Sequence, residues 1–251
     1  MGDTITFAGH STVRLDLDGT TLLTDPLLRS RFLHVRRHAA PAAEELLHDV
    51  DAVLVSHLHP DHLDFPSIRA LDRGVEMVVP AGGGRIPARR GFANVTELCP
   101  GEATRIGDVD VLATTAAHDG RRYPVGPPIE ALGFDLRSPG SHVYFAGDTD
   151  LFDEMAQLGP GIDVALLPVA GWGPKLGRGH LNARSAAEAA AMIAPRIVVP
   201  IHWGTYLRAG LERRRGELLD DPPHRLIEHA RELAPEVEVR VLGPGEEMTL
   251  A

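Results

Sequence analysis

Four side chains with metal-binding chemistry, His57, His59, Asp61 and His62, lie within six residues of the chain. They follow a run of apolar residues, half of them β-branched, which is typical of a buried strand. Because His57 and His59 are two residues apart, both rings point the same way on an extended segment. Pro60 stops the strand and turns the chain, so that Asp61 and His62 approach from a second direction. The segment therefore indicates a metal site that could serve two adjacent ions.

Three more candidate ligands, His118, Asp148 and His202, each follow an apolar run further along the chain. A carboxylate or imidazole at the end of a strand is held by rigid backbone and is still open to a cleft, as a preorganised metal site requires. Gly147 and Gly204 lie beside two of these positions and would let the backbone turn tightly there. We therefore expect strand ends to deliver these three side chains to the same site.

The elements that must position these residues can be predicted from the spacing of apolar and β-branched residues. Strands are expected at residues 4–7, 13–17, 21–24, 52–56, 76–79, 109–115, 131–136, 142–146, 164–168, 197–201 and 238–242. Helices are expected at residues 41–47, 65–71, 151–158, 183–193 and 224–233. This order indicates an α/β protein in which two sheets are faced by helices.

Length and composition favour one large domain over residues 1–251, since 43% of the residues are hydrophobic and no linker or repeat interrupts the chain. The formal net charge of −10 argues against a general basic surface for nucleic acid. Local arginine clusters at residues 29–37, 85–90 and 213–215 are candidate anion sites, although a solvated loop or helix face explains each one taken alone. Lys175 is the only lysine.

The single cysteine, Cys99, excludes an intrachain disulfide and fits a reducing compartment, with a buried, inert thiol as the expected role. The N-terminus lacks the pattern of a signal peptide, and no apolar run reaches the ~18 residues of a membrane span. We therefore expect a cytoplasmic protein that does not insert stably into a membrane. An acidic chain of this size could also form a homo-oligomer.

The ordered set of candidate ligands resembles the metallo-β-lactamase superfamily. Its signature His-x-His-x-Asp-His is matched by His57, His59, Asp61 and His62, and the later positions are matched in order by His118, Asp148 and His202. The resemblance implies a four-layer αββα sandwich with a dinuclear site. It implies one metal held by His57, His59 and His118, a second metal held by Asp61, His62 and His202, and Asp148 as the bridge.

Within the superfamily, the chain is most similar to the branch that contains ascorbate-6-phosphate lactonase and N-acylphosphatidylethanolamine-hydrolysing phospholipase D. Three segments carry this likeness, at residues 147–149, 179–181 and 200–204. The cysteine ligand of some true β-lactamases is missing, which disfavours antibiotic hydrolysis.

Two divalent ions ~3.5–4 Å apart can share a hydroxide, because coordination lowers the pKa of bound water to about 7. Asp61 could ligate a metal and orient this nucleophile, so that no serine or cysteine nucleophile is needed. Mixed imidazole and carboxylate ligation suits Zn²⁺ best, and Mn²⁺ or Fe²⁺ accept the same ligands. The predicted activity is therefore hydrolysis of a small anionic ester, phosphodiester or lactone.

Several residues outside the signature have expected roles in the site. His180 follows a glycine-rich segment, and the matching histidine in the resembling branch lies at the substrate, so we expect it to hold a phosphate or an oxyanion; the structural alternative is packing beneath the next helix. Asn182 is a candidate helix N-cap. His10 and Asp25 are expected to orient ligands through hydrogen bonds. Four aromatic residues are candidates for the pocket wall, with packing in the core as the equal alternative for each: Tyr123, Trp172, Trp203 and Tyr206.

Two other functions stay open from the sequence. The first is a di-iron oxidoreductase of the same fold, although its known examples resemble partners of a flavin domain, and no flavin module is evident here. The second is a non-catalytic regulatory protein with a structural metal. The presence of both Asp61 and Asp148 argues against this second alternative, because loss of catalysis usually removes a ligand.

Overall fold

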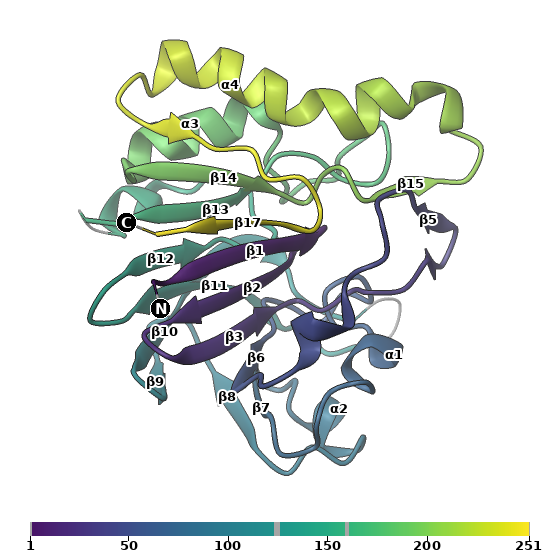
Figure 1. The fold of residues 1–251 in the computed structure, drawn as a ribbon, viewed down its shortest axis with the longest axis vertical. Coiled ribbons are helices and arrows are strands. Elements are labelled where there is room, and N and C mark those ends of the chain that lie inside the picture. Colours follow the sequence, from purple (N-terminus) through teal and green to yellow (C-terminus); the bar gives the residue numbers. More distant parts are fainter. Residues whose placement is uncertain (1, 123–125, 159–160, 251) are drawn as a thin grey trace.

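The computed structural model describes residues 2–122, 126–158 and 161–250 and contains two seven-stranded sheets (Figure 1). The first sheet has the order β17 (Glu246–Thr249), β1 (Thr4–Gly9), β2 (Thr12–Leu17), β3 (Thr20–Thr24), β6 (Ala52–Leu54), β7 (Glu76–Pro80) and β8 (Val95–Leu98). The second has the order β16 (Glu238–Val239), β14 (Ile197–Ile201), β13 (Val164–Pro168), β12 (His142–Phe145), β11 (Glu130–Arg137), β10 (Val109–Asp119) and β9 (Ala103–Ile106). A small sheet of β15 (Tyr206–Arg208), β5 (Val35–Arg37) and β4 (Arg31–Phe32) lies to one side.

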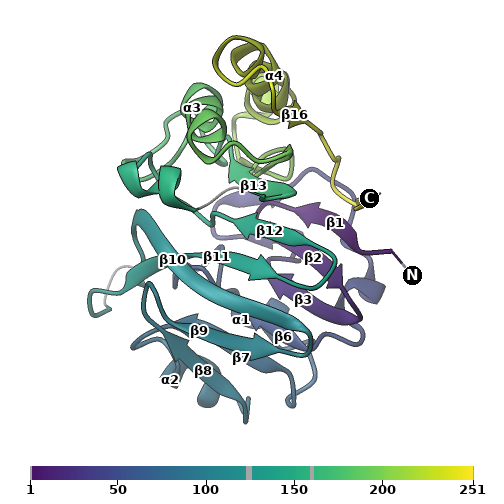
Figure 2. The same cartoon turned by 90° about the vertical axis from the view of Figure 1, so that its left-hand side faces the viewer.

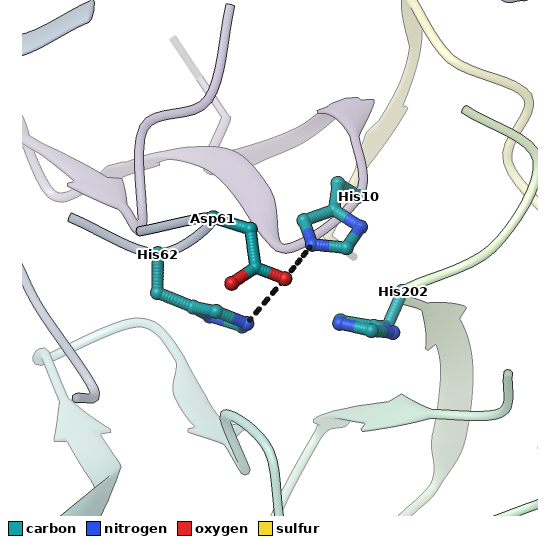
Figure 3. A group of neighbouring side chains, drawn as sticks. All are labelled: His10, Asp61, His62 and His202. Atoms are coloured by element: carbon teal, nitrogen blue, oxygen red, sulfur yellow. Dashed lines mark hydrogen bonds and ion pairs between the residues drawn. The ribbon is translucent and has the colours of Figure 1, made fainter. Parts of the chain in front are cut away.

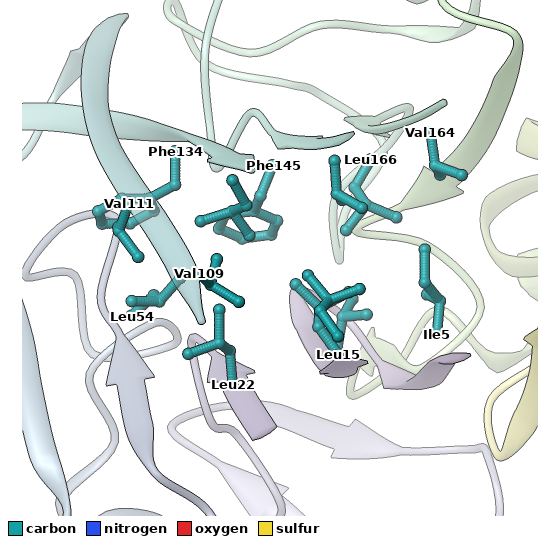
Figure 4. Packing of buried hydrophobic residues seen from close by; sticks show 14 of the residues in the cluster. Ile5, Leu15, Leu22, Leu54, Val109, Val111, Phe134, Phe145, Val164 and Leu166 are labelled. Atoms are coloured by element: carbon teal, nitrogen blue, oxygen red, sulfur yellow. The ribbon is translucent and has the colours of Figure 1, made fainter. Parts of the chain in front are cut away.

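The main core lies between the two large sheets (Figure 4). Leu15 and Leu22 of the first sheet face Phe134, Phe145 and Leu166 of the second, and all five side chains are fully buried. Burying one such side chain stabilises the fold by about 1.5–3 kcal/mol. The two sheets are thereby fixed face to face, so the loops at their shared edge are held in a constant relation.

Helices cover the outer faces of both sheets (Figures 1 and 2). The second sheet is covered by α3 (Ala183–Ile193) and α4 (Asp221–Leu233), whose apolar faces pack on the strands and on each other. The first sheet is covered by long loops and the short helices α1 (Phe65–Ile68) and α2 (Arg85–Ala88). The expected four-layer αββα sandwich is confirmed. No helix among the described residues combines the length and apolar character needed to cross a bilayer.

Two predicted helices are wrong in type and length. Residues 41–47 form only a 3₁₀ turn at Glu44–Leu47, and residues 151–158 form only a 3₁₀ segment at Asp153–Gln157. Each segment buries a single side chain, Leu46 or Met155, and so lacks the apolar stripe that stabilises a longer helix. The helix predicted at 65–71 ends early as α1, whereas Asn182 caps α3 as expected, with its side chain accepting from the N–H groups of Arg184 and Ser185.

Short strands account for most of the remaining differences. The sequence pattern did not predict β4, β5, β8, β9, β15 and β17, since each has four residues or fewer, which is too short for a clear periodic pattern. The predicted strand 238–242 shortens to β16, and β10 extends to residue 119.

The prediction of a buried Cys99 is wrong, because the residue is exposed at the turn after β8. Its N–H donates to Glu102 Oε2 at 2.7 Å. Local desolvation, followed by the carboxylates of Glu102 and Glu130, raises the pKa of the thiol. The thiol is therefore accessible but mainly protonated at neutral pH.

Candidate metal centre

The structure brings all seven candidate ligands to one edge of the two sheets. The loop after β6 contributes four of them, and the other three come from the end of β10 and from the residues after β12 and β14. His118 lies where the pairing of β10 with β11 shifts register between Thr115 and Asp119. Such an irregularity changes the direction of side chains, and here it directs His118 into the site.

The first group of ligand atoms contains only imidazole nitrogens. His59 Nδ1 lies 3.0 Å from His57 Nε2 and 3.2 Å from His118 Nε2. All three nitrogens lie within 4.8 Å of one another, which is close enough for one cation to contact each of them. This is the trio that the family resemblance implies for the first metal.

The second group contains Asp61, His62 and His202, together with His10 (Figure 3). Asp61 Oδ2 lies 3.8 Å from His62 Nε2 and 3.3 Å from His10 Nε2. The His10 ring packs on that of His202 with centroids 4.0 Å apart. His10 therefore contacts a candidate ligand, as expected, and its own nitrogen is also close enough to join this group.

Asp148 contacts three histidines, and its carboxylate also lies within 4.8 Å of the ligand nitrogen of His118 from the first group. Its Oδ2 is 3.2 Å from His62 Nε2 and 3.4 Å from His180 Nε2, and its Oδ1 is 3.4 Å from His202 Nε2. Among the described residues, His62 Nε2, His202 Nε2 and Asp148 Oδ1 are buried and lack a partner with hydrogen-bond geometry. Buried polar atoms are normally satisfied, so the convergence of these three fits a bound cation.

Hydrogen bonds behind the site orient the histidine rings. Asp25 Oδ2 accepts from His62 Nδ1 at 2.7 Å and from Ser56 Oγ at 2.6 Å. The Nδ1 atoms of His118 and His202 donate to the carbonyl oxygens of Gly179 and Ala170 at 2.8 and 2.7 Å. A donor bond at Nδ1 leaves the lone pair on Nε2, which is the atom that faces the site in all three rings.

Replacing Asp25 by asparagine is expected to lower metal affinity by about 10- to 100-fold, because the His62 ring loses the carboxylate that orients it. Competition with a fluorescent chelator measures this affinity. Asp135→Asn is the matched control, since Asp135 is a buried aspartate that accepts from His142 at 2.8 Å far from the site. Equal losses in both variants would show that the effect is a general cost of removing a buried carboxylate.

The pKa values of the candidate histidine ligands are shifted in opposite directions, so that the site is electrostatically divided. Burial lowers the pKa of His59 to about 4 and that of His202 to about 3, with neighbouring histidines adding to the effect. Burial also lowers the pKa of His62, but Asp148, Asp25 and Asp61 outweigh it and raise that pKa well above the ordinary value. Without a metal, His62 therefore holds a proton while His59 and His202 present neutral nitrogens.

Strained backbone supports the site at the strand ends. His10, Asp25 and His202 have φ angles of 59°, 35° and 61°, which non-glycine residues rarely adopt. Gly147 has a φ of 60°, and a Cβ at this position would lie 2.7 Å from the Cβ of Ser56. The expected role of Gly147 is confirmed in that only glycine fits this turn before Asp148.

A cavity of about 400 Å³ opens over the candidate ligands. Its wall includes His59, Asp61, Asp148, His180 and His202 together with residues 171–177 and Arg208. Trp172 Nε1 donates to Asp61 Oδ2 at 3.1 Å, so this side chain belongs to the wall. Lys175 is also part of it.

The other aromatic candidates differ in position. Trp203 stacks on Phe7 and donates to Pro200 O at 2.8 Å, while the Tyr206 hydroxyl donates to Arg29 O at 2.6 Å. Neither lines the cavity, so the packing alternative holds for both, and Tyr123 lies outside the described residues.

The sequence pattern did not identify Arg122, which stabilises the ligand-bearing loop after β6. Its Nη1 donates to the carbonyl oxygens of Leu58 and Leu63 at 3.1 and 3.0 Å. No local pattern marks this arginine, since its partners are about 60 residues away in the chain.

Comparisons with known proteins agree with this geometry. A Beta-lactamase superfamily domain model matches residues 20–203. A UPF0173 metal-dependent hydrolase of Rubrobacter xylanophilus is 33% identical over 258 residues, which cover 98% of this chain and 96% of that protein. Igni18, a metallo-hydrolase of Ignicoccus hospitalis, matches with a TM-score of 0.72 and 25% identity over 100% of this chain and 99% of its own. CmlA, a di-iron β-hydroxylase of Streptomyces venezuelae, shares the fold alone, with a TM-score of 0.71 and 20% identity over 99% of this chain and 54% of that one.

The chain belongs to the metallo-β-lactamase superfamily. Within that class it is an enzyme, a metal-dependent hydrolase, with a cluster of histidine and aspartate side chains that could bind metal.

Proposed function

We propose that the enzyme holds two divalent ions, Zn²⁺ by preference, and hydrolyses a small anionic ester, phosphodiester or lactone. When bound, the ions supply a hydroxide nucleophile near neutral pH and polarise the scissile carbonyl or phosphoryl group. The observation that supports two ions is the position of Asp148, which lies within 4.8 Å of the ligand nitrogen of His118 in the first trio and also contacts His62 and His202 of the second group. His57, His59 and His118 would hold one ion, Asp61, His62 and His202 the other, and Asp148 would bridge them.

In this proposal the Asp61 carboxylate is held in place by two neighbouring side chains. Its Oδ2 accepts from Trp172 Nε1 and lies near His10 Nε2, so the carboxylate is fixed in direction. Burial would raise the pKa of Asp61, but His62 and His10 hold it well below the ordinary value. The ionised carboxylate can therefore ligate a cation and accept a hydrogen bond from the nucleophile.

The preference for an anionic substrate follows from the cavity wall. Lys175 and Arg208 lie at the wall, and among the described residues neither side chain has a hydrogen bond or ion pair. Arginine matches carboxylate and phosphate oxygens through two parallel N–H donors, whereas lysine acts as a point charge. A negatively charged group on the substrate would neutralise both.

The experiment that tests this function is turnover of an activated phosphodiester, a lactone and a carboxylic ester by protein loaded separately with Zn²⁺, Mn²⁺ and Fe²⁺. We expect metal-dependent hydrolysis of at least one substrate and none by Asp61→Ala. Two bound ions without hydrolysis, combined with oxygen uptake by the iron-loaded protein, would instead favour a di-iron oxidoreductase. Fewer than one ion per chain would contradict the metal site itself.

His180 is expected to act on the substrate rather than to hold the metal. Burial lowers its pKa, but the bond to Asp148 outweighs this and raises it, so the ring can donate a proton or a hydrogen bond to a developing oxyanion. His180→Gln should lower kcat by about 10²- to 10³-fold with unchanged metal content. His142→Gln, which alters a remote histidine paired with Asp135, is the control. Loss of one ion in His180→Gln would make this residue a ligand instead.

A further inference from the structure

A second concave site lies beside α1 and the segment after α2, and it shares no lining residue with the cavity over the candidate ligands. The pocket has a volume of about 240 Å³ and is lined by six residues, which come from α1 and from the segments that follow α1 and α2. These residues are Phe65, Ile68, Arg69, Arg73, Arg89 and Arg90. Four arginines thus converge on one small hollow, which we call the arginine pocket, in a chain whose net charge is −10.

No acidic residue lines the arginine pocket, and the nearest acidic side chains in the sequence have other partners. Asp72 Oδ1 accepts from the N–H of Gly74 at 2.6 Å, and Asp64 pairs with Arg29 at 2.6 Å. Burial, followed by the charge of Arg69, lowers the pKa of Arg90, which indicates that the positive charges repel one another. Among the described residues, no carboxylate in the pocket wall offsets this repulsion between the arginines. A bound anion would reduce it.

Two of the four arginines are fixed by their surroundings. The Arg90 guanidinium lies 3.2 Å from the centroid of the Phe65 ring and donates to Ile86 O at 2.8 Å. Arg73 lies 4.7 Å from the centroid of Phe92 and donates to two backbone carbonyls, those of Ile68 and Arg69. These contacts hold both cations at the pocket wall before any ligand binds, which lowers the cost of ordering them.

The other two arginines have free donors. Among residues 2–122, 126–158 and 161–250, the guanidinium groups of Arg69 and Arg89 make no hydrogen bond or ion pair, and both residues are exposed. They come from different segments, one after α1 and one after α2. A ligand between them would therefore receive planar donors from two directions.

We propose that the arginine pocket binds a small phosphate-bearing anion at a site separate from the metal centre. A phosphate group carries a charge of about −1.5 to −2 at neutral pH and offers three acceptor oxygens, so it can pair with several guanidinium groups at once. A single carboxylate offers two oxygens and one charge, which leaves part of the repulsion in place. The binding site needs no metal and does not depend on the proposed hydrolytic function.

Calorimetric titration of the metal-loaded protein with inorganic phosphate at low ionic strength tests this proposal. In Arg69→Gln/Arg89→Gln, phosphate binding at the arginine pocket should weaken about tenfold or more, because two charged donors are removed. Arg213→Gln/Arg215→Gln makes the same change in net charge on another surface and should keep this binding. Arg208→Gln, which alters the cavity over the metal centre, should also keep it.

Three outcomes would overturn the proposal. These are the absence of phosphate binding in the unmodified protein, equal weakening in the Arg213→Gln/Arg215→Gln control, and complete loss of phosphate binding in Arg208→Gln or on metal removal. All four replaced arginines in the two double variants are exposed, so both variants should fold, and thermal melting checks this.

Discussion

Asp148→Asn is expected to release one of the two proposed metal ions and to lower kcat/KM by about 10³-fold or more. Asparagine has the same shape, but its neutral amide offers one oxygen where the carboxylate offers two. Asp148 is 2% exposed and faces His62 and His202, so the amide nitrogen that takes the place of one oxygen would face the cation site without a lone pair to offer. Removing a ligand from a centre that supplies both the nucleophile and the electrostatic stabilisation should remove most of the catalysis.

Metal content by mass spectrometry and steady-state kinetics measure the two effects of Asp148→Asn. Asp150→Asn is a suitable control, because Asp150 is an exposed carboxylate two residues further along the same loop. We expect the control to keep two ions and nearly full activity. A fully loaded and active Asp148→Asn protein would show that Asp148 does not bridge the ions, and the dinuclear proposal would then be wrong.

The strand ends explain why so much of the candidate site could be predicted from the sequence. The apolar runs before His57, Asp148 and His202 identify β6, β12 and β14. A polar side chain directly after a buried strand is held by rigid backbone and is expected to face a cleft. The two-residue spacing of His57 and His59 also gives the expected result, since both rings contact the ring of His118, with centroids 4.6 and 5.0 Å away. Local patterns therefore suffice where one strand alone sets the direction of a side chain.

Contacts between distant segments could not be predicted in this way. The hydrogen bonds from Arg122 to the ligand-bearing loop depend on how β10 and β11 are joined to the rest of the sheet. The position of Arg208 in the cavity wall depends on the small sheet of β15, β5 and β4. Those strands have two or three residues each, too few for a periodic pattern. The convergence of Arg69 with Arg89 is likewise tertiary, because 20 residues and β7 separate them.

His10 makes one contact that the sequence predicts and one that it does not. The sequence indicates an orienting role, and the structure places its Nε2 3.3 Å from Asp61 while its backbone carbonyl accepts from His202 N at 2.7 Å. One residue thus contacts two candidate ligands through different atoms. The residue type predicts the chemistry of the first contact, but only the fold reveals the second.

Metal binding at pH 6 is expected to release about one proton per chain from the ligands. Five candidate ligands are histidines, and with ordinary pKa values near 6.5 they would together hold about four protons at this pH. Burial changes this, because it lowers the pKa values of His57, His59, His118 and His202, those of His59 and His202 to about 4 and about 3. Only His62, whose pKa the three carboxylates raise, should hold a proton that a metal must displace.

The sign of the pH dependence follows from this single proton. Affinity for the ion held by His62 should rise by about tenfold per pH unit until the raised pKa of His62 is passed, whereas affinity for the ion held by His57, His59 and His118 should change little above pH 6. Titration calorimetry at pH 6 in buffers of different ionisation enthalpy counts the protons, and this pH lies below the pKa of about 7 for zinc-bound water. Release of three or four protons would show that the buried histidines titrate normally, and the electrostatic division of the site would then be wrong.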